Sequence, residues 1–145
     1  MKELFPIHAT QFYTATIYDW QHVFNDDTHK EIIIESLLFL VNNKRIELNA
    51  FVIMRNHIHL IWQAISGFTS SDIQAAFMKY TAGQIRRSLM KTNAGLLASL
   101  KVNKYDREYQ IWKREPLGID LITKSLFIQK LEYIHYNLPT GRQVL

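Results

Sequence analysis

The chain of 145 residues contains no cysteine. This absence excludes a disulfide framework and a thiolate zinc site, so any metal ion must be bound by histidine and oxygen ligands. The sequence also lacks the run of roughly 20 apolar residues that a membrane-spanning helix needs, and its N-terminus lacks the apolar stretch of a signal peptide. With no linker or internal repeat either, we expect one domain over residues 1–145, a loose tail at 139–145, a cytoplasmic location and no membrane partner.

The composition favours a folded protein with an anionic partner. Hydrophobic residues make up 48% of the chain, which is enough for a core without a structural metal, and the formal net charge is +4. The second half of the chain interleaves aromatic residues with basic ones, which are Lys79, Arg86, Arg87, Lys91, Lys101, Lys104, Arg107, Lys113 and Arg114. This pattern suits a nucleic-acid strand whose bases stack on aromatic rings, and it equally suits a solvated helix face followed by a polar loop.

Apolar periodicity predicts the element order β-α-β-β-α-β followed by a terminal helix. Strands are expected at residues 12–18, 46–54, 57–64 and 109–112, and helices at residues 28–43, from 69–72 onward, and at 123–138. Thr28 is expected to cap the first helix, with Glu31 completing a capping box. This order is that of the ferredoxin-like α+β fold, in which the helices cover one face of an antiparallel sheet.

Two pairs of side chains are candidates for chemistry. His57 and His59 leave the same face of a strand because they are two residues apart, and paired imidazoles are a ready metal-ligand pair. Tyr133 and Asn137 are four residues apart and share one face of the last helix, beside its apolar stripe. The alternatives are two half-exposed strand histidines and an ordinary tyrosine with its hydroxyl in water. Three further histidines show no ligand spacing and are expected at the surface: His8, His22 and His29.

Two segments carry a resemblance to a known family. Residues 51–62, Phe-Val-Ile-Met-Arg-Asn-His-Ile-His-Leu-Ile-Trp, resemble the hydrophobic run, Met-Pro-Asn-His-Val-His and second hydrophobic run of REP-associated tyrosine transposases and their insertion-sequence relatives. Residues 131–137 are similar to the Tyr-Ile-x-x-Asn-Pro helix of that family, and residues 111–114 to its Trp-Gln-Arg strand. Arg55 replaces the proline of the first motif.

The resemblance implies a single-tyrosine HUH nuclease that acts in DNA transposition. It makes Tyr133 the nucleophile and His57, His59 and Asn137 the ligands of one Mg²⁺ or Mn²⁺ ion. Attack on single-stranded or hairpin DNA would leave a 5′-phosphotyrosine and a free 3′-hydroxyl, and attack by another 3′-hydroxyl would reverse the step and transfer the strand. A phenol with an ordinary pKa of about 10 is a poor nucleophile at neutral pH, so a cation beside the phosphate is needed.

The resemblance leaves the assembly and the activity open. The basic residues expected to contact DNA are Lys79, Arg86, Arg87, Lys104, Arg107, Lys113, Arg114 and Lys130. Relatives include monomers and dimers, so a homodimer is one of the two assemblies that the resemblance allows. Two other functions remain as alternatives: a nucleic-acid-binding domain that does not cleave, and a domesticated transposase that binds a DNA hairpin without transposing.

Overall fold

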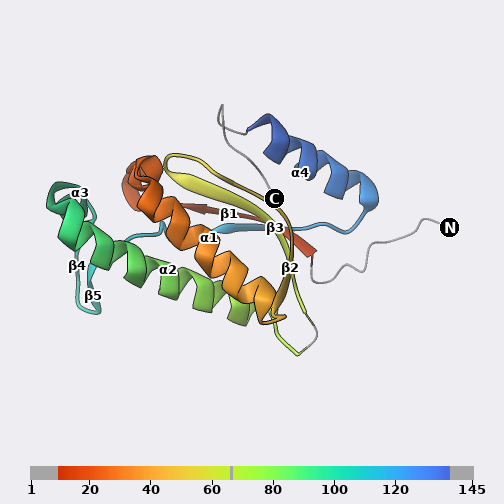
Figure 1. Cartoon of the computed structure of the whole chain (residues 1–145), viewed down its shortest axis with the longest axis horizontal. Coiled ribbons are helices and arrows are strands. Elements are labelled where there is room, and N and C mark those ends of the chain that lie inside the picture. The colour runs from red at the N-terminus through yellow and green to blue at the C-terminus, as the bar shows by residue number, and fades with distance from the viewer. Residues whose placement is uncertain (1–9, 66, 138–145) are drawn as a thin grey trace.

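The computed structural model describes residues 10–65 and 67–137. A four-stranded antiparallel sheet lies at its centre in the order β2-β3-β1-β6 (Figure 1). The strands are β1 (Thr10–Thr16), β2 (Ile46–Ile53), β3 (His57–Ala64) and β6 (Leu117–Asp120). Because β3 lies between β1 and β2, the chain forms the split β-α-β arrangement of a ferredoxin-like fold. The predicted α+β class is therefore confirmed.

Helices cover both faces of this sheet. The long helices are α1 (Asp27–Asn42), α2 (Ser70–Thr92) and α4 (Lys124–Tyr136). α1 and α2 lie together on one face, as predicted, and α4 lies on the other (Figure 1). Successive residues of β1 point to the two layers, since Tyr13 belongs to the core beneath α1 and α2, whereas Phe12 packs in the core that contains Ile134 of α4.

The prediction of a fourth strand at residues 109–112 is wrong. The strand that pairs with the second edge of β1 is β6. In this pairing Gln11 of β1 faces Asp120 of β6, and Thr14 faces Leu117. The chain between α2 and β6 instead forms a separate two-stranded sheet. The strands of this sheet are β4 (Lys101–Lys104) and β5 (Arg107–Tyr109), and the short helix α3 (Ala94–Ser99) precedes them.

Burial explains why the segment ending at Trp112 looks like a strand. Trp112 makes one isolated bridge to Ile17, just before the 3-10 helices η1 (Tyr18–Trp20) and η2 (Val23–Asn25) that lead into α1. Its indole Nε1 donates a hydrogen bond of 3.0 Å to Thr81 Oγ1 on α2. Aromatic and β-branched residues are therefore placed here to fill the core, and sequence periodicity does not separate that role from strand pairing.

Two local expectations about α1 are also wrong. Its N-cap is Asp26, whose carboxylate accepts a hydrogen bond of 2.9 Å from the backbone N–H of Thr28, so Thr28 lies inside the first turn. His29 is buried instead of exposed. Its ring nitrogens lie 2.8 Å from the carbonyl oxygen of Val23 and 3.0 Å from Ser88 Oγ, so this histidine links α1 to α2.

Other local expectations are confirmed. α2 begins after Thr69, whose hydroxyl accepts a hydrogen bond of 3.1 Å from the backbone N–H of Asp72, and β2 and β3 form the expected hairpin. His22 is exposed. His8 and the tail at 139–145 lie outside the described residues. Among the described residues, no helix is long and apolar enough to cross a membrane.

Candidate active site

The two histidines of β3 meet on the sheet face that α4 covers. In the antiparallel register His57 faces Thr16 and His59 faces Thr14, both on β1. The ring centroids of His57 and His59 are 4.8 Å apart, with an interplanar angle of 76°. The period of two along the strand thus brings both imidazoles to one place on the sheet.

A neighbouring polar side chain holds each imidazole at its Nδ1 atom. Asn56 Nδ2 donates a hydrogen bond of 3.3 Å to the carbonyl of Trp20, which leaves Asn56 Oδ1 2.7 Å from His57 Nδ1. Because an amide oxygen only accepts hydrogen bonds, His57 carries its proton on Nδ1 and keeps a lone pair on Nε2. The hydroxyl of Thr14 lies 2.8 Å from Nδ1 of His59. Such contacts orient imidazoles for ligand binding through the other nitrogen.

The Nε2 atom of His59 is buried without a partner. His59 is only 5% exposed, and its Nε2 makes no hydrogen bond to any part of the chain that the structure describes. A buried polar atom without a partner costs roughly 1–3 kcal/mol, so a bound ligand that contacts this nitrogen would stabilise the folded state.

Both imidazoles are neutral near pH 7. Burial lowers the pKa of His57. Burial also lowers the pKa of His59 to about 4, and the positive charges that Lys130 carries and that His57 acquires on protonation act in the same direction. A neutral imidazole is the form that binds a metal ion, so no proton has to be displaced for the pair to act as ligands.

Tyr133 and Lys130 of α4 complete a cluster with the histidines. The ring centroid of Tyr133 is 5.2 Å from that of His59 and 5.8 Å from that of Phe12, with both pairs edge to face. The Nζ atom of Lys130 lies 5.0 Å from the centroid of Phe12 and 5.8 Å from that of Tyr133. Tyr133 is 45% exposed, so its ring reaches the histidines while remaining open to solvent.

Asn137 has a different environment from the other candidate ligands. It is the C-cap of α4, and its Nδ2 donates a hydrogen bond of 2.7 Å to the carbonyl of Tyr133. Within residues 10–65 and 67–137, no group of three or more histidine, cysteine, aspartate or glutamate side chains could hold a metal ion. The imidazoles of His57 and His59 fit two positions around a cation, and the remaining ligands must be oxygen atoms of an amide, water or phosphate.

Four of the expected DNA-binding residues line one groove beside α2. Lys79 and Arg86 of α2, together with Arg107 and Arg114, border a hollow of about 340 Å³ whose wall includes the ring of Tyr109. We call this the basic groove. Basic and aromatic side chains that the sequence only interleaves are therefore brought together in space.

The other expected DNA contacts lie outside the basic groove. Arg87 is exposed on α2, Lys104 lies at the β4–β5 turn, and Lys113 Nζ is 4.7 Å from the centroid of the Trp20 ring. Lys130 belongs to the histidine–tyrosine cluster. The sequence-predicted basic residues are thus divided between that cluster and the part of the molecule around α2.

Sequence patterns do not identify Thr14 and Phe12 as parts of the site. Thr14 reaches His59 across a separation of 45 residues, and the Phe12 ring stacks on the His59 ring with a centroid distance of 5.2 Å. Both belong to the site because of the register between β1 and β3. Knowledge of the register between β1 and β3 would have identified Thr14 and Phe12, and neither sequence motif specifies that register.

Comparison with known proteins identifies the fold. A solved structure of a REP-associated tyrosine transposase bound to a REP hairpin matches 94% of this chain and 70% of its own, with a TM-score of 0.64 and 15% sequence identity. No family model and no curated protein matches the sequence. This likeness is one of fold, and it agrees with the family resemblance carried by the histidine and tyrosine motifs. The chain therefore has the fold of a REP-associated tyrosine transposase.

Proposed function

We propose that this protein cleaves and transfers single-stranded or hairpin DNA through a covalent bond to Tyr133. One observation carries the proposal: the ring of Tyr133 lies 5.2 Å from the ring of His59, whose buried Nε2 has no partner among the described residues. The fold match to a transposase bound to a DNA hairpin supports DNA as the partner. The basic groove offers a further surface for phosphates.

The reaction exchanges one phosphate ester for another. The phenol oxygen of Tyr133 forms a bond to the scissile phosphorus and the bond from phosphorus to the 3′-oxygen breaks. The leaving 3′-oxygen takes up a proton, and the phenol proton passes to solvent. The product is a 5′-phosphotyrosine and a free 3′-hydroxyl, and attack by the 3′-hydroxyl of another strand reverses the step.

His57 and His59 would hold one Mg²⁺ or Mn²⁺ ion, with Asn137 as the oxygen ligand. The bound cation would supply positive charge at the scissile phosphate. Thr14 and Asn56 keep the imidazoles oriented, and Phe12 fixes the His59 ring by stacking on it. The ammonium group of Lys130, 5.8 Å from the centroid of the Tyr133 ring, would attract the phosphate.

Tyr133 and His59 of one chain are already neighbours, so we propose that the tyrosine acts in cis. A homodimer that exchanges Tyr133 between subunits is therefore not required for the chemistry.

A second candidate function is hairpin binding without cleavage. It is favoured by the absence of a carboxylate ligand beside the histidines in the described chain and by the engagement of the Asn137 amide in the helix cap.

The test is formation of a covalent adduct. The full chain is incubated with labelled single-stranded and hairpin oligonucleotides and Mn²⁺, and adducts are separated on denaturing gels. We expect Tyr133→Phe to lose the adduct and keep DNA binding, whereas Tyr136→Phe, an exposed tyrosine on the same helix, keeps both. An adduct that survives Tyr133→Phe would show that the nucleophile is wrongly assigned. Hairpin binding by a native chain that never forms an adduct would favour the second candidate.

A further inference from the structure

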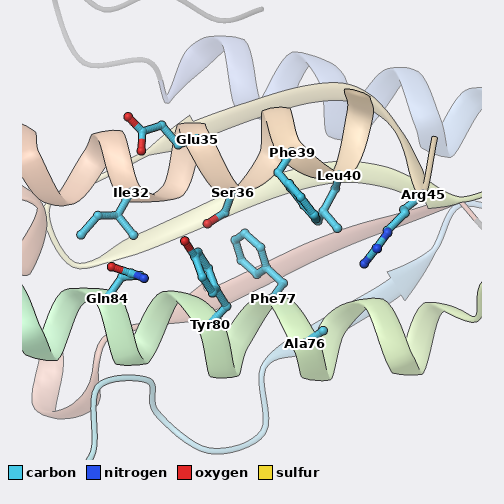
Figure 2. A pocket seen from close by; sticks show the side chains of 10 residues that line it. All are labelled: Ile32, Glu35, Ser36, Phe39, Leu40, Arg45, Ala76, Phe77, Tyr80 and Gln84. Carbon is cyan, nitrogen blue, oxygen red and sulfur yellow. The ribbon is translucent and has the colours of Figure 1, made fainter. Parts of the chain in front are cut away.

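A second hollow lies between α1 and α2 (Figure 2). These helices cover the sheet face opposite to the one on which α4 meets the histidines. We call the hollow the interhelical groove. Its volume is about 490 Å³, within the usual range of roughly 300–1,000 Å³ for ligand pockets. Leu40 and Phe77 contribute apolar side chains, and no residue of the proposed nuclease site belongs to it.

The groove contains a buried hydroxyl that lacks a partner. Ser36 is 6% exposed, and its Oγ makes no hydrogen bond to any residue in the described part of the chain. Figure 2 shows this hydroxyl directed into the space between the two helices, toward the side of Tyr80. A helical serine buried in this way is costly unless something in the groove hydrogen-bonds to it.

Two exposed aromatic rings and one ring of the core lie beside this hydroxyl. Phe39 of α1 and Tyr80 of α2 are both more than half exposed, and their rings extend into the groove together with Phe77 (Figure 2). Exposed rings on facing helices can receive a flat aromatic ligand between them. A nucleobase is such a ligand, because every base has a face that stacks on aromatic side chains.

Charged and polar groups lie at the ends of the groove. The Arg45 guanidinium is 5.2 Å from the centroid of Phe39 and 5.6 Å from that of Phe68, and it forms no ion pair with a described carboxylate. Two rings thus hold a planar cation that suits a phosphate. Glu35 and Gln84 are the other polar side chains that line the groove, and they can accept from and donate to the edge of a base.

The interhelical groove and the basic groove lie on two faces of the same helix, α2. Lys79 and Arg86 line the basic groove, whereas Tyr80 and Gln84, which are interspersed with them along the helix, line the interhelical groove. A strand whose phosphates lie in the basic groove therefore needs to cross only one helix to bring a base to Tyr80.

We infer that the interhelical groove binds one unpaired nucleotide. The base stacks on Phe39 and Tyr80 and hydrogen-bonds to Ser36, and a phosphate contacts Arg45. The inference rests on the proposed function insofar as that function makes DNA the partner. The same chemistry is offered by a nucleotide within a bound strand and by a free deoxynucleotide, so the experiment includes both.

The first arm uses hairpin oligonucleotides that carry 5-iododeoxyuridine at one unpaired position each. After irradiation of the complex with the full chain, peptide mass spectrometry should locate a cross-link to Phe39 or Tyr80 for at least one position. Tyr80→Ala should weaken binding of that oligonucleotide by roughly 5- to 150-fold, the equivalent of the about 1–3 kcal/mol of a stacked base, and Tyr80→Phe should retain most of the affinity. Leu38→Ala, at an exposed residue of α1 that does not line the groove, should have no effect.

The second arm uses saturation-transfer NMR with the four free deoxynucleoside monophosphates. A saturation-transfer signal on the base protons that is lost in Tyr80→Ala would support a site for free nucleotides. A cross-link in the first arm without such a signal would support a site for a base within a strand. If neither signal is seen, the inference is wrong. It is also wrong if Tyr80→Ala converts a dimer to a monomer, because a second copy of the chain would then occupy the groove.

The two proposals fail separately. A Tyr133 adduct without any cross-link in the interhelical groove would overturn only this inference. A cross-link at Tyr80 without an adduct would overturn only the proposed cleavage.

Discussion

The position of Tyr133 depends on how firmly α4 is held against the sheet. Within the described part of α4, Ile134 is the one buried residue, and it is 0% exposed. It packs in a core with Phe12, Val52 and Ile61, which is separate from the larger core under α1 and α2. Ile134 is therefore the most deeply buried contact of the helix that carries the proposed nucleophile, and Leu126, Phe127 and Leu131 pack beside it half-buried.

Replacing Ile134 by alanine should release α4 selectively. Removal of a buried isoleucine side chain costs about 2–5 kcal/mol, because both apolar burial and packing are lost. Even the lower value raises the opening equilibrium of the helix roughly 30-fold. The matched control is Ile128→Ala, the same change at a residue of α4 that is 42% exposed, where we expect a change within about 0.5 kcal/mol.

Hydrogen–deuterium exchange measures this opening directly. We expect amides of α4 to exchange at least about 30-fold faster in Ile134→Ala than in Ile128→Ala, while amides of α1 keep their rates. Adduct formation by Tyr133 should fall in the same variant. If the two variants show the same exchange in α4, then Ile134 does not hold the helix and the reasoning is wrong.

Three further predictions concern the histidines and the basic groove. Thr14→Val removes the hydroxyl beside His59 Nδ1 and should lower Mn²⁺ affinity about 10- to 100-fold in calorimetric titrations, and an unchanged affinity would show that Thr14 does not position this ligand. The pKa of His59 is lowered from 6.5 to about 4 in the folded protein. Between these two pH values His59 is therefore protonated mainly in the unfolded state. The free energy of unfolding should therefore decrease as the pH falls from about 6.5 toward 4, by up to roughly 3 kcal/mol, and urea titrations of His59→Gln should show a flatter pH profile. Arg114→Ala should reduce the slope of log affinity for DNA against log salt concentration by about 1, and an unaltered slope would place this residue outside the DNA contact.

Local patterns in the sequence were enough for three strands of the central sheet, for the long helices and for part of the site. The period of two places His57 and His59 on one strand face, and the period of 3.6 identifies the helices that cover the sheet. These features were predictable because they depend on neighbours within a few residues. The same reasoning predicted a helix over the segment that forms α4, since its apolar residues recur at helical spacing.

The edge strand and the buried histidine were not predictable from these patterns. β6 has only four residues, three of them exposed, so it carries no alternation that would mark it as a strand. Trp112 has strand-like neighbours and instead fills the core through its bond to Thr81. His29 has no distinctive spacing and is buried because its two ring nitrogens find partners on η2 and α2.

The amino-acid sequence by itself determined which residue types this protein has for chemistry and on which local face each one lies. Only the tertiary structure decided that Thr14 holds His59, that Tyr133 stands beside it, and that Ser36 faces a groove between two helices. The physical reason is that backbone periodicity is set by residues close in sequence. Strand register and helix docking are set instead by the summed packing of distant side chains, whose individual contributions no short motif contains.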